Sequence, residues 1–258
     1  MLRKFDYSWR WFKRSLWLIL PITGIGMAES HLGRQRCKNL IISIEADSGA
    51  RFLNQTDIQM LLTENGGDPL MGSRLDEVSL NDLENRVNRN KLIKKCQVFR
   101  DLKGNLVVEV EQEKPLARWI NTSRDGEWRN TDGYYISDEG VFFPLSDSYS
   151  ARSLLVTGSF FSKAKNLKSK NGEAIMELMR FLNTDPFWRA QIVALDADNE
   201  GEVHVRTVLG DQLVELGTAE DYQRKLDKLK LFYKKVLVQD WSRYSKISVK
   251  FRDQIVCE

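Results

Sequence analysis

The sequence predicts an α+β protein in which an N-terminal apolar segment precedes a small module and a larger, strand-rich region. Three observations predict it. Residues 15–28 carry no charge, residues 37–115 follow the order strand, helix, helix, strand, strand, and residues 116–258 hold many short strand patterns with two amphipathic helices. Helical and alternating apolar patterns that are mixed in this way are typical of layered α+β domains. We expect four parts: a tail (1–14), an apolar segment with a stalk (15–36), the module (37–115) and the strand-rich region (116–258).

Composition excludes several classes of protein. The chain has 258 residues, with 39 Lys and Arg against 36 Asp and Glu. A net charge of +3 is too small to indicate a nucleic-acid partner for the whole chain. Three cysteines in so long a chain exclude a disulfide-dense scaffold. Only two histidines are available for metal binding or general base catalysis.

The N-terminus predicts targeting to a membrane. Five cations precede the uncharged segment Ser15–Ala28, which is long enough for the core of a signal peptide but short for a membrane span. Aromatic residues at its start and flanking Lys13 and Arg14 favour an uncleaved anchor. From the residues alone, this segment is either a cleaved signal peptide or an uncleaved membrane anchor, with a buried core helix as the third alternative. The first two place the rest of the chain across the membrane.

The elements of the small module follow from periodicity and end signals. Thr56 is a plausible N-cap for a helix over Asp57–Thr63, and Ser79 precedes a helix over Leu80–Asn88. Strands are predicted at Leu40–Ala46, Ile93–Arg100 and Asn105–Glu113. Of the last two strands, Asn105–Glu113 is the more apolar, so we expect it at the centre of a small sheet and Ile93–Arg100 at an edge.

The strand-rich region contains eight further strand patterns and two helices. Glu173–Asn183 is one predicted helix, with Pro186 just past its end, and Ala219–Val238 is the other. The segment Ser245–Val256 alternates, and predicts one strand with Ile247, Val249 and Phe251 on one face. The other predicted strands are Leu116–Asn121, Tyr134–Ile136, Val141–Pro144, Leu154–Gly158, Ala190–Ala197, Glu202–Thr207 and Asp211–Leu216.

Motifs for catalysis or cofactor binding do not emerge. We find no glycine-rich phosphate loop after a strand, no nucleophile elbow and no ligand-spaced histidines or cysteines. The sequence therefore predicts no enzyme, no cofactor and no small-molecule substrate. The sequence leaves open whether Cys37 and Cys96 form a disulfide. The basic helix Ala219–Val238 is either a solvated face or a docking surface for acidic segments or lipid headgroups.

Three stretches resemble the FtsQ/DivIB family of bacterial division proteins. Residues 79–119 are similar to the second helix and hairpin of the family's POTRA domain. They run into Val110-Glu111-Gln112-Glu113-Lys114-Pro115-Leu116-Ala117-Arg118, which resembles the family's V-x-Q-x-x-P-x-A-R phrase. Tyr134–Leu145 (YYISDEGVFFPL) resembles a hairpin of the family's β-domain, and YSKISVKFRDQIVCE resembles its last strands.

The resemblance implies a non-catalytic scaffold of the division machinery. It implies that residues 37–115 are a POTRA domain, that 116–258 are the β-domain, and that Ser15–Ala28 stays as a single type II span in the inner membrane. Family members bind FtsB and FtsL in the periplasm at the septum and act through them on the septal peptidoglycan synthases. The alternative is a POTRA-containing assembly factor for outer-membrane or secreted proteins, which normally carries several POTRA copies or a transmembrane barrel.

The resemblance also suggests where partners bind. In the family the last strand lies at a sheet edge, which here corresponds to Tyr244–Val256, and an added partner strand would use its backbone donors and acceptors. Lys234 and Lys235 would extend its basic surface, and Val98 would lie on the edge strand of the POTRA domain. The residues expected in the C-terminal site are Tyr244, Lys246, Ile247, Val249, Lys250, Phe251 and Arg252.

Overall fold

The computed structural model describes residues 36–45, 51–122, 128–164, 166–237 and 242–258. The chain forms two compact units, with the division falling between Gln112 and Glu113, and Arg51 and Phe52 belong to the second unit. The expected tail 1–14 and the segment Ser15–Ala28 lie outside the described residues. Within the described ranges, no helix has both the length and the apolar character that crossing a membrane requires.

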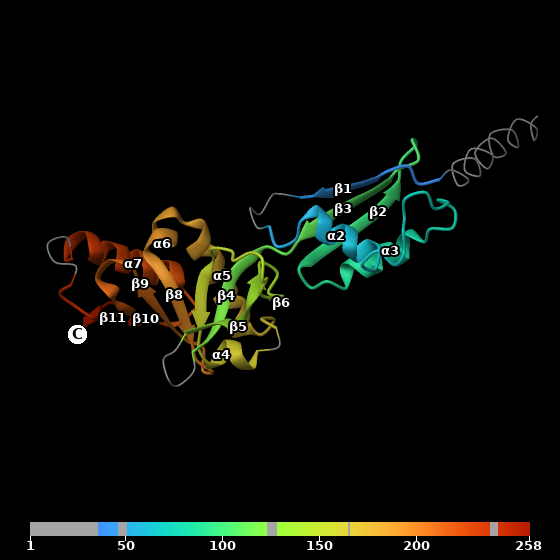
Figure 1. Ribbon diagram of the computed structural model, residues 1–258. Helices are drawn as coiled ribbons and strands as arrows, with labels where there is room; N and C mark the ends of the chain where they lie inside the picture. The colour runs from blue at the N-terminus through green and yellow to red at the C-terminus, as the bar shows by residue number, and fades with distance from the viewer. Residues whose placement is uncertain (1–35, 46–50, 123–127, 165, 238–241) are drawn as a thin grey trace, which may run out of the picture. The chain divides into compact units, whose positions relative to one another are not determined.

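The first unit has the predicted βααββ order (Figure 1). Strand β3 is central, with β1 parallel to it on one side and β2 antiparallel on the other, which confirms the expected positions of the second and third strands. Its elements are β1 (Leu40–Ile44), α2 (Gln55–Leu62), α3 (Leu80–Asn88), β2 (Ile93–Arg100) and β3 (Leu106–Gln112).

Helix boundaries in this unit follow from capping. Helix α3 spans the predicted residues, and the Ser79 side chain accepts a hydrogen bond from the Asp82 N–H, as an N-cap does. The predicted cap of α2 is wrong. Asn54, not Thr56, is its N-cap, and Asn54 and Asp57 form a reciprocal capping box that begins the helix earlier.

The core of the first unit lies between its two helices and one face of its sheet. Ile58 and Leu62 of α2 and Leu83 and Val87 of α3 are buried in it. The strands contribute alternate residues, as expected for a sheet with one face covered. They are Ile93, Cys96 and Val98 of β2 and Leu106, Val108 and Val110 of β3. On the opposite face of the sheet, side chains such as Ile41 and Phe99 are exposed.

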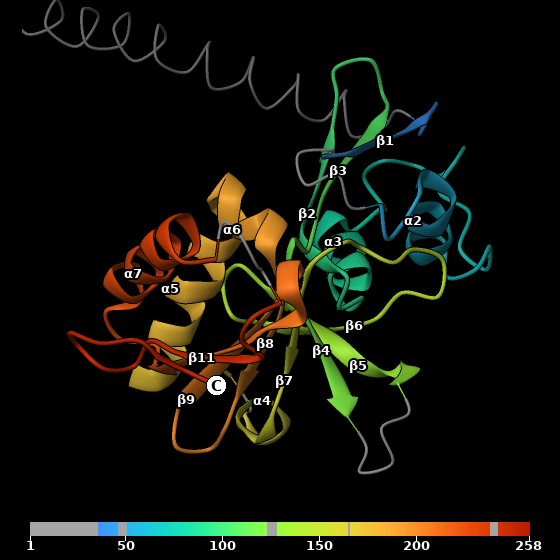
Figure 2. The same ribbon diagram turned by 90° about the vertical axis from the view of Figure 1, so that its left-hand side faces the viewer.

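The second unit is built on a nine-stranded sheet in the order β12-β11-β10-β9-β8-β7-β4-β5-β6 (Figure 2). Its strands are β4 (Pro115–Thr122), β5 (Trp128–Ser137), β6 (Phe142–Pro144), β7 (Leu154–Thr157), β8 (Ile192–Ala197), β9 (Glu202–Thr207), β10 (Leu213–Thr218), β11 (Lys246–Ser248) and β12 (Val256–Cys257). Its helices are α4 (Ser159–Lys163), α5 (Lys170–Thr184), α6 (Pro186–Gln191) and α7 (Tyr222–Lys235), with a 3-10 turn at Leu209–Asp211.

The expectation of two helices in this unit is wrong, because α4 and α6 are also present. Pro186 lies just past the end of α5, as predicted, and also occupies the first turn of α6. Asp185 caps α6 by accepting hydrogen bonds from the N–H groups of Phe187 and Trp188, both at 2.9 Å. Proline is favoured at this position, because its missing N–H would have no helical partner there.

The core of the second unit lies between the sheet and the pair α5 and α7. The two helices are side by side on one face of the sheet (Figures 1 and 2), and Phe181 of α5 contacts Tyr222 of α7 with ring centroids 5.3 Å apart. Leu226, Leu229 and Tyr233 of α7 are buried in this core. Val236, which lies inside the predicted helix Ala219–Val238, is exposed because α7 ends at Lys235.

Candidate protein-docking edge

The C-terminal edge of the nine-stranded sheet consists of two very short strands. β11 runs parallel to β10, and β12 pairs antiparallel with β11 through Ile247 opposite Cys257 and Ser248 opposite Val256. The prediction of one strand over Ser245–Val256 is therefore wrong. The outermost strand is β12, and β11 lies inside it.

Tertiary contacts interrupt the expected alternation. Ile247 and Val249, expected in the partner-binding site, are instead buried in the core, and the Val249 N–H donates to the Glu215 carbonyl at 2.9 Å. Beyond this bond the chain turns away from the sheet. Phe251 is 42% exposed and does not share the buried side of Ile247, so this part of the prediction is wrong. Ser248, expected on the open side, is buried beside β12.

The outward backbone groups of β12 follow from its pairing. Glu258 and Lys246 exchange two hydrogen bonds, of 2.9 and 3.1 Å, so the inner side of β12 is saturated at this point. In an antiparallel pair the intervening residue directs its N–H and C=O the other way. The outward groups are therefore those of Cys257. Exposed apolar side chains of Val256 (40%) and Phe251 lie near this edge in the chain.

Helix α7 holds the turn between β11 and β12 through its cations. The Lys228 Nζ donates to the carbonyls of Phe251 and Gln254, the latter at 3.2 Å, and an Arg224 guanidinium nitrogen donates to the Arg252 carbonyl at 3.4 Å. Burial lowers the pKa of Lys228. The carbonyls thus compensate a partly desolvated ammonium. These contacts fix the turn that leads into β12.

Lys234 and Lys235, which are predicted to extend the basic surface of this site, do not contact the turn between β11 and β12. Both are exposed in the last turn of α7, whereas the contacts with the turn come from Arg224 and Lys228, nearer the start of the helix. Sequence reasoning missed this pair because all the cations of α7 look alike in the sequence. Only the position of the turn distinguishes them.

A carboxylate on β10 organises the predicted cations. The Lys246 Nζ lies 2.7 Å from a Glu215 carboxylate oxygen, and Lys250 Nζ and His204 Nε2 each lie 3.9 Å from that carboxylate. The hydrogen bond from Lys246 lowers the pKa of Glu215, and Glu215 in turn raises the pKa of Lys246. Lys246 is therefore directed onto its own sheet. Arg252 is exposed beyond it.

Tyr244 lies just before β11, against α7. It is half-buried, with its ring centroid 6.2 Å from that of Phe232 of α7 and the Arg243 guanidinium carbon 5.4 Å from its ring. Tyr244 therefore packs the start of β11 onto the helix rather than presenting a free aromatic surface.

Val98, the residue expected on an open edge of the first unit, does not offer a free donor. Its side chain is buried, and its N–H donates to a Glu84 carboxylate oxygen of α3 at 2.8 Å. β2 lies at an edge as predicted, but the expectation of an unpaired donor at Val98 is wrong. Helix α3 supplies the acceptor that a neighbouring strand would otherwise provide.

Chemistry beyond protein contacts has little support in the described part of the chain. There, no group of three or more His, Cys, Asp or Glu side chains is arranged to hold a metal ion. Cys37, Cys96 and Cys257 are free thiols, so the Cys37–Cys96 bridge is not formed. The site is an edge of backbone donors and acceptors with charged and apolar neighbours.

Together the two units define a protein with a small βααββ domain followed by a larger sheet domain. A POTRA-like domain model matches residues 35–111, and a model described as FtsQ/DivIB, C-terminal related, matches residues 127–258. The second match covers just over half of the chain, so the chain belongs to the FtsQ/DivIB family. A search of curated proteins gives no match. The family consists of non-catalytic scaffolds of cell division, so the chain has a role in division at the septum through contacts with other division proteins.

Proposed function

We propose that the chain binds FtsB and FtsL in the periplasm and through them links early division proteins to the septal peptidoglycan synthases. In this proposal Ser15–Ala28 anchors the chain in the inner membrane as a single type II span, with residues 37–258 on the periplasmic side. The basic flank before the segment and its aromatic residues support the anchor and its orientation.

The observation that carries the proposal is the outward side of β12. Cys257 directs its backbone N–H and C=O away from β11, which suits the addition of a strand from FtsB. Exposed Val256 and Phe251 supply apolar contacts near the edge, and Lys250 and Arg252 supply charge for carboxylates of the partner. Backbone bonds would give affinity, and these side chains would give choice of partner.

A single backbone donor tests the proposal. The full-length variant Cys257→Pro removes the outward N–H, and its ring faces the open edge, where proline is tolerated. The matched control Cys257→Ala removes the thiol and keeps the N–H. We expect co-purification of FtsB to fall roughly fivefold to tenfold in the proline variant, which is the loss of about one hydrogen bond, and to stay unchanged in the control. Equal recovery of FtsB with both variants would refute docking at β12.

The charges give a second arm of the same experiment. Reversing both Lys250 and Arg252 to Glu keeps the backbone donors and acceptors of β12, and hydrogen exchange of β11 and β12 checks that the new carboxylate beside Glu215 does not open the edge. Weaker co-purification, together with a smaller dependence on salt concentration, supports pairing with carboxylates of the partner. If the reversal leaves FtsB recovery unchanged, these cations only keep the edge soluble.

A further inference from the structure

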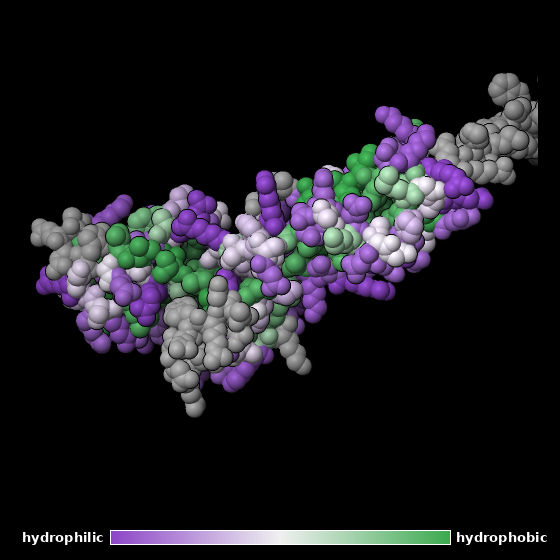
Figure 3. Space-filling model, viewed as in Figure 1, coloured by the Kyte–Doolittle hydropathy of each residue, from purple (hydrophilic) through white to green (hydrophobic). Residues whose placement is uncertain are grey.

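The strand β1 is the second edge of the small sheet, and its sequence is unlike that of a protected edge. Its residues are Leu-Ile-Ile-Ser-Ile, with no charge and no proline. Natural edge strands usually carry charges, proline or a covering element, because exposed backbone groups otherwise accept another strand. Figure 3 shows apolar residues along β1, and Ile41 is 45% exposed.

The opposite edge, β2, is protected by charged side chains and by two side-chain hydrogen bonds, whereas β1 is uncharged and is bonded in this way at the Ile42 carbonyl, by Gln55. The outward donor of β2 at Val98 is bonded to Glu84, and the Arg100 guanidinium donates to the Val78 carbonyl at 2.9 Å. Lys94 and Lys95 add charge to the same strand. Of the two edges, β1 is therefore the one that is suited to receive a strand.

The bonds between β1 and β3 identify the groups that point outward. The Asn39 carbonyl accepts from the Leu106 N–H at 3.0 Å, and the Glu45 N–H donates to the Val110 carbonyl at 2.9 Å. Backbone direction alternates along a strand, so Leu40, Ile42 and Ile44 direct their N–H and C=O away from β3. The Gln55 side chain already donates to the Ile42 carbonyl at 3.0 Å, which confirms this direction. No strand formed by the described residues lies on this side of β1.

The open face beside this edge begins with an apolar row. Ile41 of β1 is paired with Val107 of β3, which is paired with Phe99 of β2. Phe99 is 41% exposed, close to the value for Ile41. A strand added to β1 would continue this row, so its side chain beside Ile41 is expected to be apolar or aromatic.

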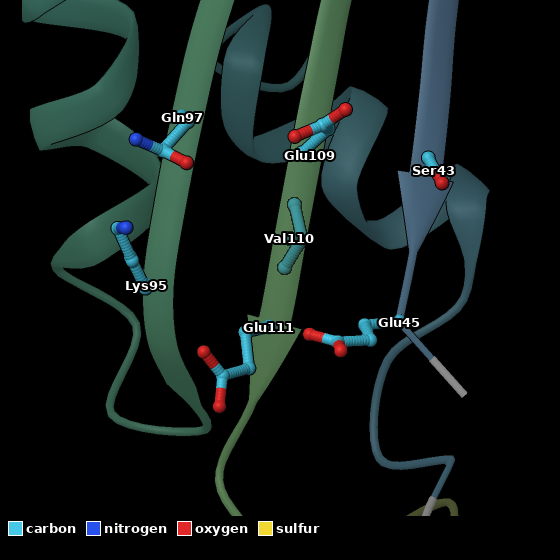
Figure 4. Close-up of a pocket in the computed structure, with 7 residues that line it drawn as sticks. All are labelled: Ser43, Glu45, Lys95, Gln97, Glu109, Val110 and Glu111. Carbon is cyan, nitrogen blue, oxygen red and sulfur yellow. The ribbon is translucent and has the colours of Figure 1, made fainter. Parts of the chain in front are cut away.

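The same face becomes acidic toward the end of β1. Figure 4 shows the carboxylates of Glu45, Glu109 and Glu111 on it, around a hollow of about 370 Å³. The lysines of this region, Lys94 and Lys95, are on the far strand β2, and Lys94 pairs with Glu111 at 3.2 Å. The side of the face next to the β1 edge is therefore negative, which opposes an anionic lipid surface and favours a cation.

We propose that the β1 edge binds an extended segment of another protein that carries a lysine or arginine beside Glu45 and an aromatic residue beside Ile41. The added strand runs antiparallel, the more stable pairing. Its alternate residues, beside the half-buried Leu40, Ile42 and Ile44, are apolar. The proposal does not depend on FtsB binding at β12, since the two edges belong to different sheets.

The test uses full-length protein in detergent micelles and a fluorescein-labelled probe peptide, Lys-Val-Thr-Val-Phe-Val, flanked by Gly-Ser. Its lysine lies opposite Glu45 and its phenylalanine opposite Ile41. The variants Ile41→Lys and Phe99→Lys are a matched pair, because the two residues flank Val107 with similar exposure. We expect Ile41→Lys to weaken binding roughly threefold to fivefold by fluorescence anisotropy, and Phe99→Lys to weaken it less than twofold.

A charge-swap pair and amide hydrogen exchange complete the experiment. A peptide with glutamate in place of lysine should bind the wild type more weakly and regain affinity for the variant Glu45→Lys. In hydrogen exchange, the probe should protect the amides of Leu40, Ile42 and Ile44. Protection of β2 instead, or equal effects of Ile41→Lys and Phe99→Lys, would overturn the assignment. Dimers cross-linked through Ile41→Cys that exclude the peptide would also overturn it, since they make a second copy the occupant.

Discussion

The three cysteines differ in their surroundings, and this difference decides their chemistry. Cys96 of β2 is buried in the first unit, and burial raises its pKa to about 11. Cys37 is also buried, and desolvation raises its pKa, while a backbone hydrogen bond from Leu106 acts in the opposite direction. Cys257 is only half-buried on β12. Thiolates, not thiols, react with alkylating agents.

We predict that iodoacetamide at pH 8 labels Cys257 first. With a pKa of about 11, only about one Cys96 in a thousand is a thiolate at that pH, in addition to being covered. Cys37 and Cys96 should react only after unfolding in guanidinium, which mass spectrometry of the labelled peptides measures. Fast labelling of Cys96 in the folded protein would show that the core of the first unit opens readily. Failure of Cys37 and Cys96 to label in denaturant without reductant would indicate a disulfide.

At the scale of the element, the turn between β11 and β12 depends on α7. Replacing Lys228 by Met keeps the apolar stem and removes the donor to the carbonyls of Phe251 and Gln254. We predict that amide hydrogen exchange over residues 249–257 becomes about tenfold faster in this variant, because the turn loses a charge-assisted contact. Lys234→Met, on the exposed end of the same helix, is the control and should leave exchange unchanged. Equal exchange in both variants would mean that pairing with β11 alone orders the turn.

Local patterns predicted elements well where the local signal and the tertiary contacts agree. Helix α3 has a serine cap and a regular apolar stripe, and β2 is bounded by turns, so both appear with the predicted ends. The last strand could not be predicted in this way. Its alternation continues past Val249, but the bond to Glu215 and the contacts with Lys228 turn the chain. Such contacts join residues far apart in the sequence, which periodicity does not report.

The docking edge also depends on contacts that periodicity in the sequence does not report. The sequence placed it in a single strand over Tyr244–Val256, whereas the outermost strand of the sheet is the separate strand β12. Which backbone groups point outward depends on register, and a shift of one residue would exchange them. The edge of the first unit is a stronger case. Leu40–Ile44 has a generic strand sequence, and only the order β1-β3-β2 reveals it as an uncharged edge.

At the scale of the whole molecule, each unit has its own buried core and its own sheet edge. Among the described residues, twenty-seven that are buried form the core cluster of the second unit and thirteen that of the first. Because each edge is carried by its own core, a change at one edge need not disturb the other. A protein with two such edges is suited to hold two partners, which is the physical requirement for a scaffold.

The two functions considered for a POTRA-bearing chain differ in what its loss does to a cell. We predict that depletion produces long filaments with normal levels of outer-membrane proteins, because a division scaffold is needed for septation and not for barrel assembly. Microscopy and quantitative immunoblots of the outer membrane measure the two results in the same culture. Cys257→Ala should restore division and Cys257→Pro should not, at equal protein levels, since only the second lacks the outward donor of β12. Loss of outer-membrane proteins before any filamentation would instead support an assembly factor, because a defect in septation alone leaves barrel insertion intact.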